Sequence, residues 1–312
     1  MNFHLYSESG QRKLPKIELN KKINDPRLYL PPKGLVGAVN VALNLGQPLL
    51  LTGEPGTGKT QLAHHLAYYF DLGKVIVFNA QTTSTAKDLF YRYDALGHFQ
   101  YSQTQTEPLT PEQVEEKYIR YQGLGAAIRS QSRRVVLLDE IDKAPRDLPN
   151  DVLAALEELR FDLPEIGKSF ETTADNRPVI IMTSNSEKNL PDAFLRRVAY
   201  FHIEFPAAGD LLRILQQKLD GFDSEAGKKQ LDAIITHFEM IRAKDRVKLK
   251  KDPATAELIQ WAALLRKMEF DASKLNNLSG LAAEEKEQLS LSYSILAKNK
   301  EDLKALQGLL NL

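Results

Sequence analysis

The sequence contains no cysteine, which excludes a disulfide framework, a thiolate metal site and a cysteine nucleophile. It also lacks a net charge, because 41 lysine and arginine residues balance 41 aspartate and glutamate residues. That balance excludes a histone-like polycation, although it leaves room for a local basic patch. No apolar run approaches the roughly 18 residues that a membrane-spanning helix needs. The first residues show no apolar stretch after a basic one, so we expect no secretory signal and a soluble, cytoplasmic protein without a membrane partner.

What the chain does contain is the composition of an ordinary globular protein. Hydrophobic residues make up 43% and charged residues 26% of its 312 positions, enough for a sizeable core. This length suggests about two domains. Residues 1–33 are polar, rich in lysine and interrupted by prolines, and we expect them to form an irregular N-terminal arm.

Five short apolar runs follow the arm, and they occupy residues 47–53, 74–80, 133–140, 178–185 and 200–205. The first four are nearly continuous in valine, isoleucine and leucine, which is typical of strands covered on both faces. Helical patterns separate the runs, as at residues 60–70 and 151–161. Strands that alternate with helices predict an α/β domain with a parallel sheet in three layers, which we place over residues 34–206.

The composition changes after this region. Between Phe222 and Leu312 the only proline is Pro253, and apolar positions recur at helical spacing. We therefore expect a linker over residues 207–222 and a small helical domain over residues 223–312.

Two stretches of the α/β domain are longer than a crossover needs, namely residues 84–110 and 162–176. We expect inserted hairpins or loops there, and insertions of this kind are often functional. Residues 91–101 interleave aromatic side chains with Arg92, a pattern that favours a hairpin over a nucleic-acid surface because only one arginine supports the latter.

The strongest motif is a glycine-rich loop of the form G-x-x-x-x-G-K-[ST]. It consists of Gly53, Glu54, Pro55, Gly56, Thr57, Gly58, Lys59 and Thr60, with Gln61 next to it on the following helix. The glycines let backbone N–H groups converge on phosphate oxygens, and the helix adds the positive end of its dipole. Lys59 can reach the β- and γ-phosphates, and the Thr60 hydroxyl can bind Mg²⁺. An apolar strand before the loop and a helix after it make an unliganded glycine turn the weaker interpretation.

The second motif is a pair of carboxylates, Asp139 and Glu140, at the end of the apolar run 133–140. The carboxyl edge of a parallel sheet is where phosphate and metal bind in such folds. Asp139 would hold Mg²⁺, directly or through water, and Glu140 would act as a general base on the attacking water. The alternative is an acidic pair that caps a helix.

Polar residues also follow the last two apolar runs. Asn185 ends the run 178–185 and could orient the attacking water, although asparagine is also common in turns. Arg196 and Arg197 are adjacent on a short helical segment. One of them could stabilise transition-state charge on a phosphate bound by a neighbouring subunit, and surface ion pairing is the alternative.

Taken in this order, the four motifs resemble those of an AAA+ ATPase, and most of all the MoxR-type branch with its carbon-monoxide-dehydrogenase-accessory relatives. The resemblance rests on residues 47–60, 135–158 and 190–206. It implies a five-stranded sheet, a helical lid, and ATP with Mg²⁺ bound between the subunits of a ring, commonly a hexamer. Arg197 matches the position of the family's arginine finger. Arg196 stands where an aspartate is usual, so the choice between the two arginines stays open.

The same resemblance likens residues 84–110 to the helix-2 insert of this branch and residues 161–177 to the hairpin before the Asn185 strand. One position departs from the family pattern: Glu257 stands where the lid of many relatives carries an arginine sensor. Arg266 and Lys251 are nearby substitutes.

The function implied is ATP hydrolysis in a ring that remodels or matures a partner protein, with a von Willebrand factor A domain protein as the partner of MoxR-type relatives. An ATPase that acts with nucleic acid in restriction or defence is the alternative, which the neutral net charge disfavours. Glu140 argues against a small-molecule kinase, because kinases exclude water. We expect partner contacts in the inserts, through Tyr91, Tyr93 and Phe99.

Overall fold

The chain divides into an α/β unit and a helical unit. The computed structural model describes residues 14, 16, 20–104, 107–145, 148, 153–185, 190–244 and 246–311. Of these described residues, the α/β unit holds those within 31–54 and 58–204, and the helical unit holds those up to Leu30, residues 55–57 and those from Phe205 onward. Among the described helices, none combines the length and the apolar character that crossing a membrane requires.

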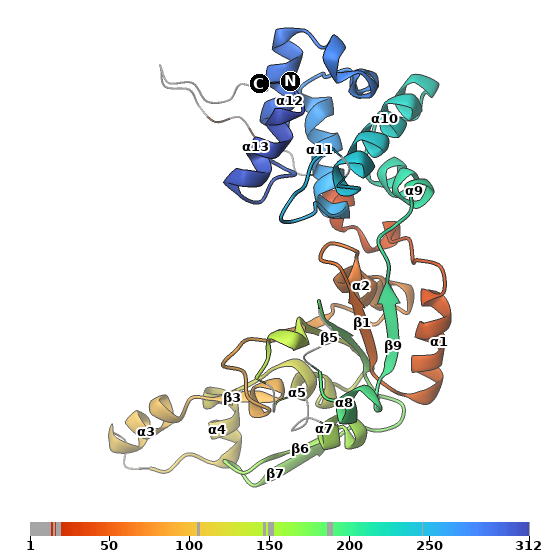
Figure 1. The fold of residues 1–312 in the computed structure, drawn as a ribbon. Coiled ribbons are helices and arrows are strands. Elements are labelled where there is room, and N and C mark those ends of the chain that lie inside the picture. The colour runs from red at the N-terminus through yellow and green to blue at the C-terminus, as the bar shows by residue number, and fades with distance from the viewer. Residues whose placement is uncertain are drawn as a thin grey trace. The chain divides into compact units, whose positions relative to one another are not determined.

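A five-stranded parallel sheet lies at the centre of the α/β unit (Figure 1). Its strands are β1 (Leu49–Gly53), β2 (Ile76–Asn79), β5 (Val135–Asp139), β8 (Val179–Thr183) and β9 (Ala199–Ile203). They are ordered β2-β5-β8-β1-β9, and every neighbouring pair is parallel. All five apolar runs of the sequence form strands of this sheet, and the predicted α/β fold class is confirmed.

Helices cover both faces of the sheet. The unit contains α1 (Leu35–Leu45), α2 (Lys59–Tyr69), α5 (Gly123–Ile128), α7 (Leu153–Glu158) and α8 (Asp192–Leu195), with the short turns η3 (Lys87–Leu89) and η4 (Ile141–Lys143). Alternate strand residues share a face: Leu50, Val136 and Met182 belong to one apolar cluster with α5. The neighbouring residues face the other way, where α2 packs against β5, β1 and β8. Burial on both faces explains why these strands are almost wholly apolar.

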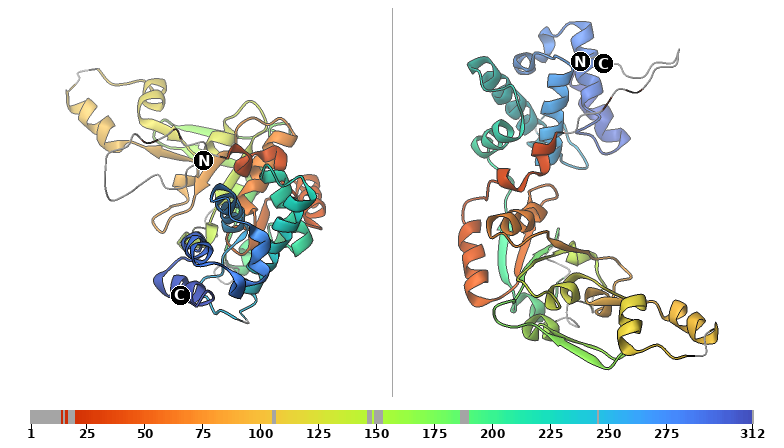
Figure 2. Two further views of the ribbon diagram at one scale, coloured as in Figure 1. Left: turned by 90° about the horizontal axis from the view of Figure 1, so that it is seen from above. Right: turned by 180° about the vertical axis from the view of Figure 1, so that it is seen from behind.

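Two small antiparallel pairs extend the α/β unit. β6 (Arg160–Leu163) and β7 (Lys168–Glu171) form a hairpin that begins two residues before the expected second insert and lies otherwise inside it. β3 (Tyr91–Tyr93) pairs with β4 (Ile119–Tyr121), and α3 (Ala95–Thr104) and α4 (Pro111–Tyr118) lie between them in sequence. Figures 1 and 2 show α3 and α4 projecting away from the central sheet.

The hairpin expected over residues 91–101 is wrong, because only Tyr91–Tyr93 is a strand and the chain then turns into α3. Asp94 explains the turn. Its Oδ1 accepts a hydrogen bond from the Gly97 N–H at 2.9 Å, and its backbone oxygen accepts one from the His98 N–H at 3.0 Å. An aspartate that binds the N–H three residues ahead starts a helix, so it ends the alternating strand pattern.

The helical unit has its own apolar core. Its main helices are α9 (Ala208–Lys218), α10 (Glu225–Arg242), α11 (Thr255–Lys267), α12 (Ala283–Ser292) and α13 (Lys300–Gly308), and its short turns are η1 (Lys21–Asn24), η2 (Pro26–Leu28), η5 (Ala272–Asn276) and η6 (Leu278–Gly280). Phe238, Trp261 and Tyr293 are among the largest fully buried side chains.

Two segments differ from their expected form. The predicted linker 207–222 contains α9, whose Leu211 and Leu215 are fully buried in the helical core, so it is part of the unit and not a free connection. The arm is also tied to this helix. Lys218 is buried and its Nζ donates to the backbone oxygen of Ile23 at 2.6 Å, while Asn20 Nδ2 donates to the Lys218 oxygen at 2.8 Å. Residues 20–30 are therefore held on the helical unit.

Candidate functional site

A phosphate-loop geometry joins β1 to α2. Gly58 precedes the first residue of α2 with φ 91°, and Gly56 has φ 76°. Side chains with a Cβ are strained in this left-handed region, so the two glycines are needed for the turn. No side chain caps the start of α2. Its first N–H groups therefore point into the loop, which is a favourable place for an anion.

Lys59 is the cation of this loop. Only 7% of the residue is exposed, and its Nζ donates to the Gly53 oxygen at 2.7 Å and to the Glu54 oxygen at 2.9 Å. An ammonium has three donors, so one of them has no acceptor among the described residues. Burial lowers the pKa of Lys59. The nearby carboxylates oppose this effect, and Asp139 contributes most to the opposition. The loop thus holds a buried positive charge with a donor to spare.

Thr60 and Asp139 meet beside this lysine. Thr60 Oγ1 donates to Asp139 Oδ1 at 3.2 Å, from the start of α2 to the end of β5. A hydroxyl and a carboxylate at this separation form an all-oxygen donor set, which is the kind that Mg²⁺ prefers.

Thr183 completes the cluster, and sequence reasoning missed it. Its hydroxyl donates to Asp139 Oδ1 at 2.5 Å and accepts a hydrogen bond from the Glu140 N–H at 2.9 Å. The register of β5 against β8 pairs Leu138 with Met182, which brings the next residues of the two strands side by side. The only sequence signal of Thr183 is a hydroxyl at the end of an apolar strand, two residues before Asn185.

Glu140 lies just beyond the strand in a left-handed backbone conformation, with φ 56° and ψ 48°. Such a conformation costs a non-glycine residue on the order of 1–3 kcal/mol and is concentrated at functional sites. Its Oε2 accepts a hydrogen bond from Lys143 Nζ at 2.5 Å, and its Oε1 accepts one from Asn185 Nδ2 at 3.4 Å. The bond to Glu140 raises the pKa of Lys143. Lys143 is a second residue that sequence reasoning missed.

Asn185 lies next to Glu140, and its backbone N–H also donates to Asp142 Oδ1 at 3.2 Å. The structure therefore brings Lys59, Thr60, Asp139, Glu140 and Asn185 together at the carboxyl edge of the sheet. This arrangement can bind an anion at the lysine, hold a divalent cation at the Thr60–Asp139 pair and present a carboxylate and an amide to a water molecule.

The two arginines do not join this cluster through any contact between described residues. Arg197 forms an ion pair with Glu157 through its Nε, and its Nη1 donates to the Ala193 oxygen at 3.0 Å. Arg196 is exposed, and no described carboxylate pairs with its side chain. Surface ion pairing, the alternative to a finger role, thus describes Arg197 in the single chain.

Glu257, at the expected sensor position, has a structural use inside the helical unit. Its Oε2 accepts a hydrogen bond from the Ala254 N–H at 3.1 Å, which caps α11, and its Oε1 pairs with Lys298 Nζ at 2.9 Å. Arg266, one of the two substitutes, lies over the Phe222 ring.

Comparison with known proteins agrees with this architecture. Residues 48–198 match the family model of the AAA domain (dynein-related subfamily). Spastin of Dictyostelium discoideum is 24% identical over 256 residues, which are 82% of this chain and 33% of spastin. The protein YehL of Escherichia coli (strain K12) is 27% identical over 232 residues, which are 69% of this chain and 59% of YehL. The chain thus spans about a third and about three fifths of the length of these relatives.

Solved structures of two variants of the RuvB protein of Thermotoga maritima are also similar to the chain. Their identities are 17% and 16% and their TM-scores 0.49 and 0.47, and each comparison covers 90% of this chain and 81% or 80% of the other. None of these similarities singles out the MoxR-type branch, which stays a prediction. The matched segment, the five-stranded parallel sheet and the phosphate loop together show that the α/β unit has the P-loop NTPase fold of AAA domains.

Proposed function

We propose that the protein is a Mg²⁺-dependent ATPase of the AAA+ type that works as a ring, in the manner of MoxR-type motors, and remodels or matures a partner protein. The observation that carries this proposal is the cluster at the carboxyl edge of the sheet. There a buried lysine, a Thr60–Asp139 pair and the Glu140 carboxylate lie on adjoining elements.

The residues present fit ATP and Mg²⁺. The backbone of the loop from Gly53 to Gly58 and the first turn of α2, with Gln61, would hold the phosphates, and Lys59 would supply the positive charge. Thr60 and Asp139 would hold the metal ion as oxygen ligands. The bound ion would neutralise charge on the β- and γ-phosphate oxygens. Thr183 keeps the Asp139 carboxylate in place through its short hydrogen bond.

Glu140 is the proposed general base, and Asn185 the residue that helps to orient the attacking water. Both lie within hydrogen-bond reach of each other, so one water can contact the two side chains. Lys143 engages the second carboxylate oxygen of Glu140. An ion-paired carboxylate is a weaker base, so release of Lys143 would prepare Glu140 for proton transfer.

Steady-state ATP hydrolysis and ATP binding of Glu140→Gln test this function. Turnover should fall by about 10²–10⁴-fold, because the amide cannot accept a proton, while binding should persist. Lys143→Gln is the matched control, since it removes the charge that engages Glu140 and keeps the carboxylate. If Glu140→Gln hydrolyses ATP as fast as the unchanged protein, the proposal fails.

A ring, proposed as a hexamer, would let an arginine of one subunit reach the ATP of the next. Arg197 matches the family position, and its pair with Glu157 would have to open for that role. Arg196 carries an exposed guanidinium without such a pair among the described residues. Replacement of either arginine by alanine should leave ATP binding intact. The variant that lacks the finger arginine should hydrolyse ATP about 10³-fold more slowly.

A mixing experiment separates an arginine that acts on the neighbour from one that acts within its own subunit. The slower arginine variant, mixed with Lys59→Ala, should regain part of its activity, because some interfaces then combine an intact loop with an intact arginine. Specific activity should also rise with protein concentration. Activity that is independent of concentration and shows no recovery on mixing contradicts a ring.

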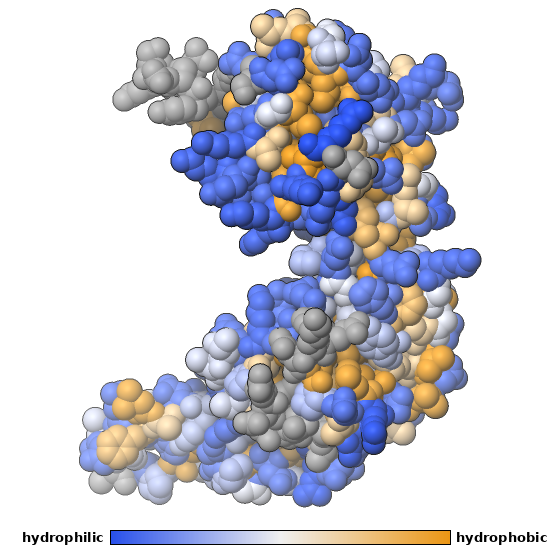
Figure 3. Space-filling model, viewed as in Figure 1, coloured by the Kyte–Doolittle hydropathy of each residue, from blue (hydrophilic) through white to orange (hydrophobic). Residues whose placement is uncertain are grey.

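The proposed partner surface lies on α3. Leu96 is 66% and Phe99 60% exposed, and α3 buries none of its residues. Figure 3 shows an apolar patch at this projecting end of the α/β unit. Tyr91 does not belong to it, contrary to the sequence expectation: it is buried, contacts the Phe161 ring, and donates its hydroxyl hydrogen to Glu165.

A double variant, Leu96→Ser with Phe99→Ser, therefore tests partner binding better than any replacement of Tyr91. It should keep its fold and its basal ATP hydrolysis and lose capture of a protein with a von Willebrand factor A domain. Leu45→Ser is the control, because Leu45 is also exposed and lies on α1. Equal capture by the double variant and the control would contradict a partner site on α3.

A further inference from the structure

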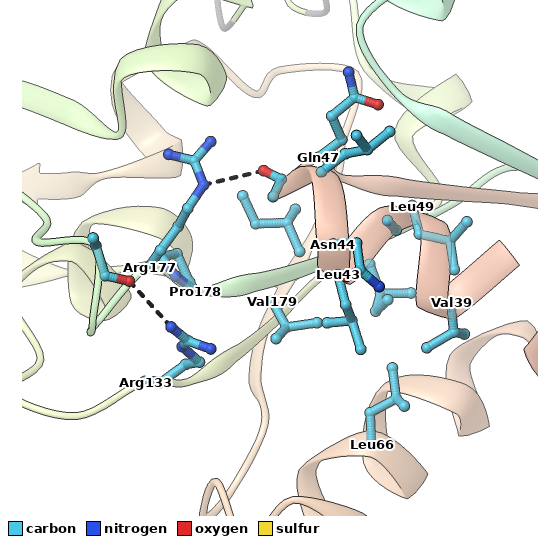
Figure 4. Close-up of a pocket in the computed structure, with 16 residues that line it drawn as sticks. Val39, Leu43, Asn44, Gln47, Leu49, Leu66, Arg133, Arg177, Pro178 and Val179 are labelled. Atoms are coloured by element: carbon cyan, nitrogen blue, oxygen red, sulfur yellow. Dashed lines mark hydrogen bonds between the residues drawn. The ribbon is translucent and has the colours of Figure 1, made fainter. Parts of the chain in front are cut away.

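A second site lies at the opposite edge of the central sheet. A cavity of about 330 Å³ opens where β1 and β8 begin, between the end of α1, the Leu66 turn of α2 and the segment that leads into β8 (Figure 4). The phosphate loop follows the other end of β1, so the two places are separated by the length of a strand. Nothing in the proposed ATP chemistry uses this cavity.

The wall of the cavity is aliphatic on one side. Its apolar side chains come from α1, β1, α2 and β8, and they include Val39, Leu43, Leu49, Leu66 and Val179. The lining residues that the structure describes include no aromatic ring, so they offer no surface on which a nucleobase could stack. The lining instead suits a flexible hydrocarbon chain, and the volume falls within the range of small-molecule sites, about 300–1,000 Å³.

Two arginines lie on the other side of the cavity, as Figure 4 shows. Arg177 donates from Nε to the Gly46 oxygen at 3.1 Å, and Arg133 donates from Nη2 to the Ala174 oxygen at 3.1 Å. Each guanidinium has five N–H donors, so most of them have no acceptor among the described residues. Among the described residues that line the cavity there is no aspartate or glutamate. The backbone bonds hold both groups in place, and no described carboxylate pairs with either charge.

We propose that this cavity binds a small amphiphilic carboxylate, a molecule with one carboxylate head and an aliphatic tail. The head pairs with the guanidinium groups of Arg177 and Arg133, whose planar forks match a carboxylate. The tail lies against Leu43, Leu49 and Val179, where it covers apolar surface that water would otherwise contact. Neither arginines alone nor an apolar wall alone would select this class of ligand.

Isothermal titration calorimetry of the full chain with decanoate tests the proposal. Decanoate should bind, whereas acetate, which lacks the tail, and decanol, which lacks the charge, should bind at least tenfold more weakly. Arg177→Met should weaken decanoate binding by about 10–100-fold, the usual loss for a charged hydrogen-bonding partner. Arg134→Met is the matched control. Arg134 also donates to a single backbone oxygen, that of Lys74, and it does not line the cavity.

A second variant tests the apolar wall and guards against misfolding. Leu43→Trp adds volume to a half-buried wall residue and should block decanoate, and thermal melting should show that the variant is folded. The proposal is overturned if decanoate fails to bind at about 1 mM, or if it binds equally well to folded Arg177→Met and Leu43→Trp. It is also overturned if decanoate does not bind and Leu43→Trp changes the sedimenting mass, since the cavity would then be covered by a second copy of the chain.

Discussion

Both units bury polar side chains, but they bury them in different places. In the α/β unit the buried Thr52, Thr183 and Ser184 lie at or just after the ends of β1 and β8, and the buried Lys59 begins α2. In the helical unit the buried His237, Ser292 and Asp302 lie on α10, α12 and α13, among apolar side chains. At the sheet edge, Lys59 keeps one N–H donor without an acceptor among the described residues, whereas His237, Ser292 and Asp302 bond to other groups of the helical unit.

Three buried polar groups of the helical core have hydrogen-bond partners within the unit. His237 Nε2 and the Tyr293 hydroxyl are 2.9 Å apart, and Trp261 Nε1 donates to Ser292 Oγ at 2.9 Å. Asp302 accepts hydrogen bonds from the Lys250 N–H at 2.7 Å and from Asn299 Nδ2 at 2.6 Å. Buried polar groups with such partners contribute to a unique packing, and they are costly to break. We therefore expect changes in the helical core to affect stability, and changes at the sheet edge to affect activity.

The largest effect should follow from Trp261→Ala. Trp261 is fully buried, and removing a buried tryptophan costs about 3–5 kcal/mol of unfolding free energy. Urea unfolding followed by circular dichroism measures the loss. Trp261→Phe should lose less, because it keeps an aromatic ring and forfeits mainly the bond to Ser292. A Trp261→Ala protein of unchanged stability would break the contrast between the two units.

Acidification should affect the helical core next. Burial lowers the pKa of His237 from 6.5 to about 4, and Arg246 acts in the same direction. A base whose pKa is lower in the folded state stabilises the fold above pH 6.5. That contribution is lost as the pH falls from 6.5 to about 4, and it amounts to about 3 kcal/mol. Unfolding free energies measured across this range should show the slope, and His237→Phe should flatten it.

Lys59→Ala should lower activity and leave stability unchanged, in contrast to the two changes above. Loss of the loop cation should weaken ATP binding by about 10–100-fold, the equivalent of one charged hydrogen-bonding partner, and hydrolysis should fall with it. The melting temperature should not fall, because the change removes a buried charge. Lys74→Ala, at an exposed lysine, is the control. An unfolded Lys59→Ala protein would mean that this lysine is structural, like the buried groups of the helical core.

Thr183→Val should give the smallest effect and sharpen the contrast further. It removes the hydroxyl between Asp139 and the Glu140 N–H while it keeps the shape of the side chain. A hydrogen bond to a carboxylate is worth about 1.5–3 kcal/mol, but Thr183 acts on turnover only through Asp139 and Glu140, so turnover should fall by up to about tenfold. Thr183→Ser should retain most of the activity. If Thr183→Val leaves turnover unchanged and lowers stability, the threonine belongs to the core and not to the site.

Much of the fold could be predicted because local patterns decide it. Short continuous apolar runs favour strands covered on both faces, and the glycines with Lys59 are typical of a strand–loop–helix context. The misplaced features depend on single side chains or on distant packing. Asp94 turns a strand pattern into a helix through one hydrogen bond, and α9 lies in a stretch expected to be a linker because its burial depends on partners elsewhere in the chain.

The same distinction holds at the candidate site. Lys59, Thr60, Asp139 and Glu140 could be expected together because each ends or follows an element with a recognisable motif. Thr183 and Lys143 could not, since their roles follow from strand register and from the turn after Glu140. The cavity at the opposite edge of the sheet could not be predicted from the sequence either, because Gly46 and Arg177 lie far apart in the sequence and meet only in the fold.

The hydrogen bonds of Lys218 have a consequence for how this protein can be divided. Its ammonium group is buried against the backbone oxygens of Lys22 and Ile23, which lie before the α/β unit in the chain. A fragment that begins at Phe205 would retain every main helix of the helical unit and still leave that charge without its carbonyl partners. Such a fragment would fold independently only if residues 20–30 were added back, as a separate peptide or by circular permutation.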